Sequence, residues 1–446
     1  MTNLPKPPIE GQQNSLSAEE IKAKVVQELN QYLAIVHTKS TYILFEKAPT
    51  DFVLDSKVSM RAYFNTDLVE IEGKLIKKFD VWFNNPKRRV FKNIIFDPRI
   101  PGHQNGEYNL WKGFAYQPIQ GDCSLFLEHM RNVICGESEK HYEYLLNWCA
   151  YLVQKPWEIG TSVLLRGLQG TGKGVFVHGL GTLFGHHYAQ LASLDQILGR
   201  FNSHLQHSIL VLADEAIWGG NKKEVGALKA LITEKRQFIE AKGKDGYWIA
   251  NHKHLIVSSN EDFVVHLDAD DRRFFVLDVS SQRKEDIAYF KAIENQLKSG
   301  GYEALLYELM SRDISCFDPR IMPDNFAGFD IKMMSATSIE RFLYSALKDG
   351  CWDIALAEPS YRFATDILSD RFYTLYGNWC DWTHEKTLGR EIVGIRIRKI
   401  FPSTLKKKSS REENPKRPPF YIFLSFEECR RDFERFFKQN DSIWDL

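Results

Sequence analysis

A short stretch of the chain, residues 164–180, has the residue types and spacing of a phosphate-binding loop. It reads LLRGLQGTGKGVFVHGL, in which Gly167, Gly172 and Lys173 fit the pattern G-x-x-x-x-G-K. Glycines let backbone N–H groups turn inward around phosphates, and the lysine neutralises the β and γ phosphates. We therefore expect a nucleotide to contact Gly167, Gly170, Thr171, Gly172, Lys173, Gly174 and Val175.

The residue after the lysine departs from the usual pattern. Ser or Thr normally follows, and its hydroxyl binds the magnesium of the nucleotide, but here the residue is Gly174. A water can replace that hydroxyl, because magnesium keeps several waters and takes only one or two protein ligands. We expect an active site whose metal binding is somewhat weakened.

Two further apolar segments end in side chains that suit such a site. ILVLADEA contains Asp214 and Glu215, and KHLIVSSNE carries Asn260. Burying a carboxylate without a partner is costly, so two acids at the end of a buried strand need a role. Open α/β sheets bind ligands at their strand ends. There Asp214 would hold the magnesium shell, Glu215 would polarise the attacking water, and Asn260 would sense the γ-phosphate. The expected ligands are ATP and Mg²⁺.

Each of these features also has a purely structural interpretation. Gly167 and Gly170 could be turn glycines, the Asp-Glu pair could cap a helix, and Asn260 could simply terminate a strand. One shared nucleotide site accounts for all three together better than three separate explanations do.

The elements that would position these residues form an α/β pattern between residues 160 and 280. SVLLRG, HSILVLADE, KHLIVSSNE and RRFFVLDV are strand-like, and GVFVHGLGTLFG can continue from the loop as a helix. Continuous apolar strands separated by helices predict a parallel sheet that is covered on both faces. The fold class that we expect is therefore α/β.

The flanking segments have other patterns. Residues 1–17 are polar and proline-rich and are expected to be disordered, whereas 18–33 follow a Ser N-cap with helical spacing. LAIVHTKSTYILFEK predicts two short strands, and residues 123–154 and 283–312 have helical periodicity.

The order of the motifs resembles that of the superfamily 3 helicases of viruses, phages and plasmids. YNLWKGFAYQP, FLEHMRNVICG and YLLNWCAYLVQKP are similar to the segment before the ATPase core in phage and prophage primase–helicases of the poxvirus type, and the resemblance covers about residues 75–280 well. It implies an AAA+ P-loop ATPase that forms a homo-hexameric ring and unwinds single-stranded or forked DNA during replication of a phage or mobile element. The first 120 residues are short for a primase and have no D-x-D pair on a strand, so a primase or polymerase would be a partner.

The patterns and the resemblance together give the expected domains. They are a disordered tail (1–17), a mixed α+β domain (18–120), a helical collar (121–156), the AAA+ ATPase domain (157–312) and a helical, winged-helix-like DNA-binding domain (313–446).

The resemblance also implies residues that contact DNA. FIEAKGKDGYWIAN consists of two β-prone runs around KGKDG, which predicts a hairpin with a tight turn at Asp-Gly. Lys242 and Lys244 would lie near its tip, where six such tips in a ring would grip phosphates without reading sequence. The alternative is a solvated turn with two surface lysines.

A ring of this kind completes each site with an arginine from the neighbouring subunit, which stabilises charge on the transferring phosphoryl group. The family places it shortly after the strand that carries the asparagine. Arg272 and Arg273 lie 12 and 13 residues beyond Asn260, and Arg272 is favoured. Alternatively, both arginines form salt bridges with Asp268, Asp270 and Asp271.

The C-terminal part of the chain contains a basic segment. Lys386–Arg417 holds eleven Lys or Arg and three acidic residues, and PPFYIFLSFEECRRDFERFF after it predicts a strand and then a helix. This resembles the winged-helix module of related helicases, and the segment could contact duplex backbone or be a solvated basic loop.

Bulk composition leaves several functions open. The formal net charge is zero, so nucleic-acid binding must come from local clusters. Seven cysteines without a C-x-x-C pair, no signal peptide and no apolar run of about 20 residues favour a cytoplasmic protein, in the bacterial host if phage-encoded. The alternatives to a helicase are an initiator or loader ring and a DNA-binding ring with a degenerate ATP site, for which Gly174 is the best argument. A small-molecule P-loop kinase fits poorly.

Overall fold

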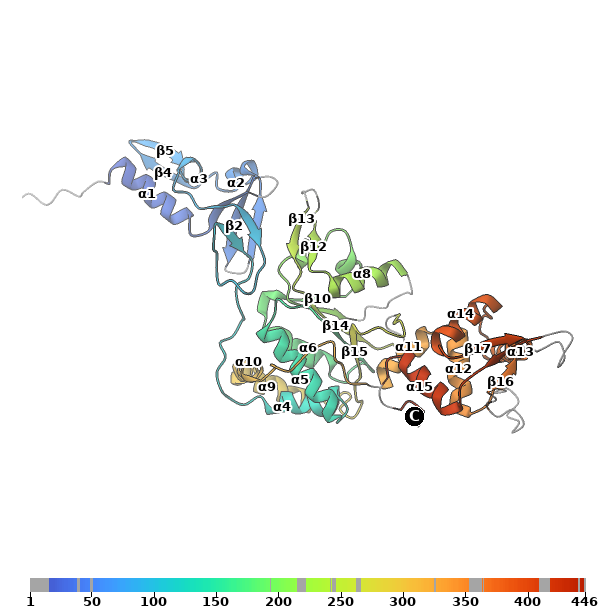
Figure 1. The fold of residues 1–446 in the computed structure, drawn as a ribbon. Helices are drawn as coiled ribbons and strands as arrows, with labels where there is room; N and C mark the ends of the chain where they lie inside the picture. Colours follow the sequence, from blue (N-terminus) through green and yellow to red (C-terminus); the bar gives the residue numbers. More distant parts are fainter. Residues whose placement is uncertain are drawn as a thin grey trace, which may run out of the picture. The chain divides into compact units, whose positions relative to one another are not determined.

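The chain divides into two compact units, which Figure 1 shows in a computed structural model. One unit comprises residues 1–113 with 236–250, and the other comprises residues 114–235 with 251–446. The structure describes residues 16–37, 41–48, 51–192, 194–214, 222–240, 242, 246–261, 266–324, 326–352, 363, 365–408, 418–439 and 442–444. Within this part of the chain, no helix combines the length and apolar character needed to cross a bilayer.

The first unit is a mixed α+β structure. Its helices and strands are α1 (Ala18–Leu29), β1 (Leu33–His37), β2 (Thr41–Ala48), β3 (Asp51–Asp55), α2 (Lys57–Tyr63), β4 (Leu68–Ile71), β5 (Lys74–Lys77), α3 (Lys78–Asn84), β6 (Val90–Phe91), β7 (Asn93–Ile95) and β8 (Glu107–Asn109). The two strands expected after the first helix are β1 and β2, which pair antiparallel in a sheet of order β3-β2-β1-β6. Ser17 and Glu20 form a capping box that starts α1. The helix ends four residues earlier than the periodicity predicts, because the chain turns there into β1.

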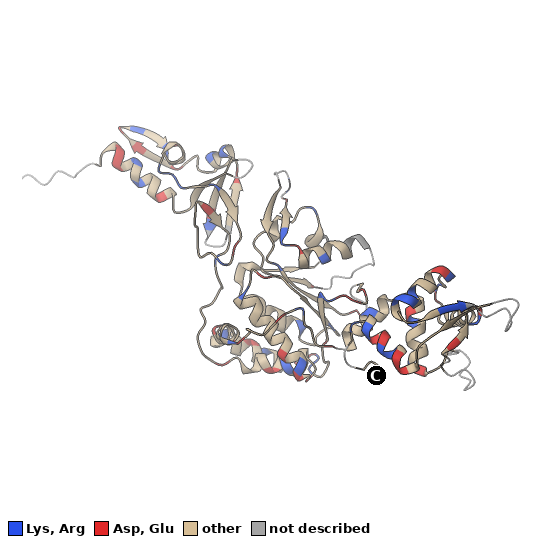
Figure 2. Ribbon diagram, viewed as in Figure 1, with Lys and Arg blue, Asp and Glu red and all other residues tan. Residues whose placement is uncertain are grey.

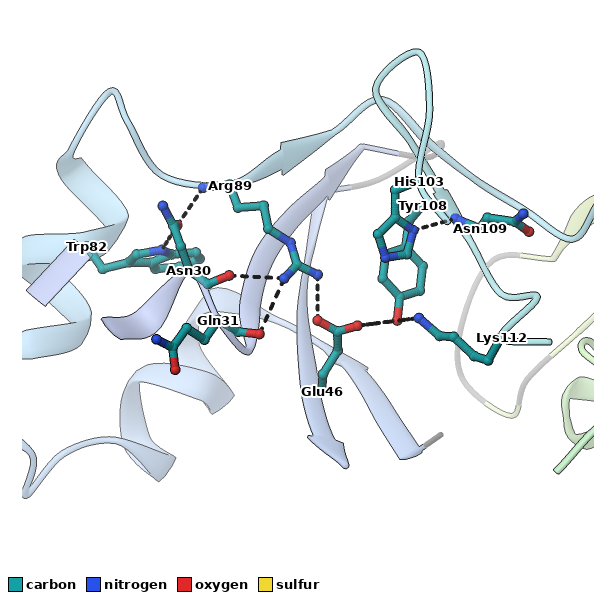
Figure 3. A network of polar contacts seen from close by, with 9 residues as sticks. All are labelled: Asn30, Gln31, Glu46, Trp82, Arg89, His103, Tyr108, Asn109 and Lys112. Carbon is teal, nitrogen blue, oxygen red and sulfur yellow. Dashed lines mark hydrogen bonds and ion pairs between the residues drawn. The ribbon is translucent and has the colours of Figure 1, made fainter. Parts of the chain in front are cut away.

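A half-buried polar network fastens β8 and the residues that follow it to this sheet (Figure 3). Glu46 on β2 accepts hydrogen bonds from the Tyr108 hydroxyl at 2.6 Å and from Nη2 of Arg89 at 2.5 Å. The Nζ atom of Lys112 lies 3.6 Å from the same carboxylate. Burial alone would raise the pKa of Glu46, but the hydrogen bonds from Tyr108 and Arg89 outweigh it and lower that pKa. Glu46 is therefore the anionic centre that two cations share.

The first unit also contains the expected hairpin. β12 (Arg236–Ile239) pairs antiparallel with β13 (Tyr247–Ala250), and Phe238 lies opposite Trp248. Of the turn between them the structure describes Glu240, Lys242 and Gly246, and Lys242 is exposed. Lys244 lies outside the described residues.

The second unit is built on a parallel sheet of five strands. In spatial order they are β10 (Tyr188–Leu191), β11 (Leu210–Asp214), β14 (His254–Ser259), β9 (Ser162–Arg166) and β15 (Phe274–Asp278). All four neighbouring pairs are parallel. β9 and β14 are buried along their whole length, which explains their continuous apolar sequence. The expected α/β class with a parallel sheet is confirmed.

Helices cover both faces of this sheet (Figure 1). The helical elements of this part of the second unit are α4 (Ser124–His129), a π-helical turn (Met130–Ile134), α5 (Glu139–Gln154), α6 (Lys173–Thr182), a 3-10 turn (Gly185–His187), α7 (Leu194–Leu198), a 3-10 turn (Ser203–Leu205), α8 (Lys222–Thr233), α9 (Ile287–Gln296), a π-helical turn (Leu297–Gly301), α10 (Tyr302–Ser311) and α11 (Phe326–Ser335). The helical pattern at 283–312 is two helices with a kink between them, where Gly300 has a φ of 98°. α8 and α11 share a core with the sheet strands.

The last part of the second unit is a group of helices with a small antiparallel sheet. Its elements are α12 (Ser338–Asp349), β16 (Asp366–Leu368), α13 (Ser369–Thr383), α14 (Arg390–Ile400), β17 (Leu405–Lys408), β18 (Pro419–Ile422) and α15 (Phe426–Phe436), with the strand order β16-β18-β17. β18 and α15 are the strand and helix predicted at this end. Figure 2 shows Lys and Arg on α14 and β17. Residues 409–417 of the basic segment lie outside the described residues.

Candidate nucleotide site

The glycine-rich loop connects β9 to the start of α6, and its backbone needs glycine. Gly170 and Gly172 have φ values of 77° and 98°, which side chains rarely allow. A Cβ atom on Gly172 would lie 2.5 Å from Cε1 of His129. Gly174 differs, because a Cβ there would meet only His178 at 3.6 Å, an ordinary contact. The missing hydroxyl at 174 is therefore not a consequence of lack of space.

Lys173 is the first residue of α6 and is buried, with a relative exposure of 6%. Its Nζ atom donates hydrogen bonds to the carbonyl oxygens of Gly167 at 2.5 Å and Leu168 at 2.9 Å. A third hydrogen bond joins Nζ to Oδ1 of Asn260 at 2.9 Å. The amino group thus lies inside the loop and also contacts the residue that follows β14.

Thr171 and Val175 complete the predicted contact residues of the loop. Thr171 is buried, and its hydroxyl donates to the Leu168 carbonyl oxygen at 2.9 Å, which closes the loop on itself. Val175 is half-buried in the first turn of α6.

The strand order brings Asp214 and Asn260 to the edge formed by the C-terminal ends of the strands, where the loop also lies. β14 lies between β11 and β9, with Asp214 beside Ser258 and Ser259 beside Arg166. Asp214 is half-buried and accepts a hydrogen bond from Nε2 of Gln190 at 3.0 Å. Glu215 lies outside the described residues. The edge therefore gathers an amine, an amide and a carboxylate from three adjacent strand ends.

His129 is a contact of the loop that the sequence did not reveal. Its Nε2 atom lies 3.1 Å from the carbonyl oxygen of Gly172 and must donate the hydrogen bond, since a carbonyl only accepts. The hydroxyl of Tyr289 lies 3.3 Å from the Nδ1 atom, which is left to accept. Burial lowers the pKa of His129 to about 4, so the ring is neutral at physiological pH. No spacing signal marked this histidine, which lies 43 residues before the glycine that it contacts.

Arg166, the last residue of β9, is the second contact that the sequence did not reveal. Its guanidinium forms two hydrogen bonds with Asp278 of β15, at 2.6 and 2.9 Å, and one with Asp330 of α11 at 2.7 Å. These carboxylates, Asp278 first, raise the pKa of Arg166 above its ordinary value. The group fixes the end of the strand from which the loop departs.

Arg272 and Arg273 lie at the edge of the sheet that is formed by the N-terminal ends of the strands, whereas the loop lies at their C-terminal ends. β15 is parallel to β9, and Phe274 lies beside Ser162, at the start of the strand whose end carries the loop. Five residues of strand separate the two edges by roughly 16 Å, so neither arginine reaches the loop of its own chain. Arg273 pairs with Asp271 at 3.2 Å, the salt bridge foreseen as the alternative. Arg272 is exposed and has no ion pair among the described residues.

The comparisons with known proteins find a family of unknown function and a phage DNA primase-polymerase. Residues 165–273 match DUF5906, a family of unknown function, and this segment spans every residue predicted to carry the chemistry. A DNA primase-polymerase of Nitratiruptor phage NrS-1 is 29% identical over 143 residues, which are 31% of this chain and 20% of that protein. The match therefore spans about a fifth of the length of this curated relative.

Solved structures extend the likeness to nearly the whole chain. Two apo structures of the NrS-1 C-terminal region superpose with TM-scores of 0.67 and 0.65 at 16% and 17% identity. They cover 90% and 91% of this chain and 99% and 100% of theirs. The chain thus has the fold of that region.

Proposed function

We propose that this chain is the ATP-hydrolysing motor of a DNA helicase for phage or mobile-element replication, built as a superfamily 3 AAA+ ring of six copies. The observation that carries the proposal is the hydrogen bond between Lys173 and Asn260, formed where the loop and two neighbouring strands end together. The likeness to a phage DNA primase-polymerase supports the replication context. A primase or polymerase is the partner that this likeness favours.

The residues of the site suit a triphosphate with magnesium. The positive φ values at Gly170 and Gly172 give the loop a backbone shape that side chains rarely allow, and Lys173 supplies the positive charge. Magnesium, when bound, would neutralise charge on the phosphate oxygens, and Asp214 would hold its water shell. Asn260 would exchange its bond to Lys173 for one to the γ-phosphate. In this proposal Glu215 orients the attacking water.

The position of Arg272 supports assembly into a ring. An exposed arginine at the far edge of the sheet cannot complete the site of its own chain but is available to the site of a neighbour. We place the helical segment 121–156 at the collar of that ring. We assign DNA contacts to Lys242, Lys244 and the winged-helix-like C-terminal part.

The experiment that tests the proposal is ATP hydrolysis by the full chain with and without single-stranded DNA. We expect DNA to stimulate hydrolysis, and Lys173→Ala to abolish it. Lys298→Ala is the matched control, because Lys298 is an exposed lysine paired only with Glu294 on the surface. The proposal fails if the wild-type chain binds DNA but does not hydrolyse ATP.

A second candidate is an initiator or loader that melts DNA without processive unwinding. Gly174 favours it, because the absent hydroxyl weakens the metal site that fast hydrolysis needs. Strand displacement on a forked duplex separates the two, since only the helicase continues to unwind as the duplex is lengthened.

A further inference from the structure

The hairpin β12–β13 has one buried and one exposed face. Side chains alternate across its strands, so that Ile239 and Ile249 are 1% and 4% exposed, whereas Phe238 and Trp248 are 40% and 58% exposed. Arg236 begins the exposed face and is itself exposed. Burial of the isoleucines fixes the register and leaves the two large aromatic rings on the opposite, partly exposed face.

The exposed rings are arranged as a contiguous surface. Phe238 and Trp248 lie directly opposite each other across the two strands, with their ring centroids 5.5 Å apart and in edge contact. The guanidinium of Arg236 lies 5.5 Å from the centre of the Trp248 ring. The fourth residue of this face within the two strands is Ala250, so the strand residues of the face are one cation, two aromatic rings and one methyl side chain. We name Arg236, Phe238 and Trp248 the hairpin platform.

We propose that the hairpin platform stacks the bases of single-stranded DNA, an inference that rests on the proposed function and deepens it. Every base has a flat π-face, so aromatic rings and a guanidinium plane bind bases without sequence preference. Bases inside a duplex are already stacked on each other, so the platform would select unpaired strands. Lys242, exposed in the turn of the same hairpin, adds a positive charge for the phosphates.

The composition of the platform argues against a protein as its occupant. A stable protein interface buries roughly 800 Å² on each partner around an apolar core. The platform and Ala250 beside it, four residues of which one is charged, offer far less. Stacking on a single base needs only one ring and is worth about 1–3 kcal/mol.

Binding of two oligonucleotides of equal length and charge tests the inference. One carries thymine bases, and the other has the same backbone with abasic sites. We expect the wild-type chain, without nucleotide, to bind the thymine strand more tightly, and Trp248→Ala to weaken that binding by about fivefold or more while leaving the abasic strand unaffected. Trp248→Phe, which keeps a ring, should retain most of the preference.

Trp382→Ala is the matched control, because Trp382 is also an exposed tryptophan, at 62%, on α13. It should change neither affinity. The inference is overturned if Trp248→Ala weakens both strands equally or neither, or if it changes the oligomeric state in the absence of DNA, which would make the platform a contact between copies of the chain.

The same variants separate this inference from the proposed function. Basal ATP hydrolysis without DNA should be the same for Trp248→Ala and the wild type, since the platform is not part of the nucleotide site. If the wild-type chain hydrolyses ATP but binds the thymine and abasic strands equally, the inference fails and the proposed function stands. If the chain prefers the thymine strand through Trp248 but does not hydrolyse ATP, the proposed function fails and the inference stands.

Discussion

The carbonyl oxygen of Gly172 accepts a hydrogen bond from Nε2 of His129 across 3.1 Å, and this bond holds the residue that immediately precedes Lys173. Because burial keeps the imidazole neutral, the bond adds no charge to the loop that we propose binds phosphates. In the nucleotide site that we propose, His129 is thus a positioning residue, which sets the shape of the loop through the Gly172 carbonyl.

His129→Phe should weaken ATP binding and spare the chemical step. The phenyl ring fills similar space but cannot donate a hydrogen bond to the Gly172 carbonyl. Part of the free energy of ATP binding is then used to order the loop. One neutral hydrogen bond corresponds to an increase of about 2- to 10-fold in KM or in the Kd for a non-hydrolysable analogue. Steady-state kinetics at saturating ATP should give an unchanged kcat. A fall in kcat with an unchanged KM would contradict the positioning role.

Gly172→Ala and Gly174→Ser should have opposite effects, although both add a side chain to the loop. At 172 the new Cβ would clash with His129 and Phe290 at a φ of 98°, so nucleotide binding should be lost. At 174 a side chain fits, and the serine hydroxyl can bind magnesium. We expect the magnesium concentration for half-maximal hydrolysis to fall by about 2- to 10-fold in Gly174→Ser. An unchanged magnesium dependence would show that Gly174 does not weaken the metal site.

Mixing two inactive variants tests whether Arg272 acts on a neighbouring subunit. Lys173→Ala lacks its own site but keeps Arg272, whereas Arg272→Ala keeps the site but lacks the arginine. Mixed rings should therefore contain some complete sites and recover part of the ATPase activity that each variant lacks alone. Titrating one variant into the other measures this, with Lys173→Ala/Arg272→Ala as the control that should rescue nothing. Full activity of Arg272→Ala alone would exclude the role.

Lys253, just before β14, should lower the stability of the chain below neutral pH. It is 2% exposed, and its amino group has no hydrogen-bond partner among the described residues. Burial lowers its pKa from 10.5 to about 7. Between these two pKa values the unfolded chain binds more protons than the folded chain, so the free energy of unfolding rises with pH in this window. Below pH 7 the buried amino group is charged, and its destabilising effect is fully present.

Lys253→Met should therefore stabilise the chain at pH 6 by about 1–3 kcal/mol, because it removes an unpaired buried charge and keeps the side-chain length. Urea unfolding of both proteins at pH 6 and pH 9.5 measures the effect. The advantage of the variant should shrink at the higher pH. A constant difference, or a less stable variant, would count against the unpaired lysine as its cause.

The sequence predicted four of the five strands of the parallel sheet, but it predicted neither β10 nor the order of the strands. Continuous apolar runs identified β9, β11, β14 and β15, because burial on both faces leaves that pattern in any parallel sheet. The insertion of β14 between β9 and β11 depends on packing between distant segments, which no local pattern records. That insertion is what brings Asn260 to Lys173.

The sequence predicted the candidate-site residues that belong to a motif. It did not predict the residues that hold the motif in place. Lys173 and Asp214 follow strands at recognisable spacing, so their types alone suggested their roles. His129 and Arg166 contact partners 43 and more than 100 residues away and have no motif of their own. The arginine pair was expected from resemblance, but its placement at the far edge of the sheet and the pairing of Arg273 with Asp271 required the structure.

The two edges of the parallel sheet carry different groups of the proposed site, so ATPase activity should depend on the concentration of the protein. One edge holds the loop with Lys173, and the other holds the exposed Arg272. If each site needs both edges, an isolated chain has two half-sites and no complete one. Specific activity per chain would then fall on dilution, before any subunit unfolds, and DNA that holds subunits together would restore it.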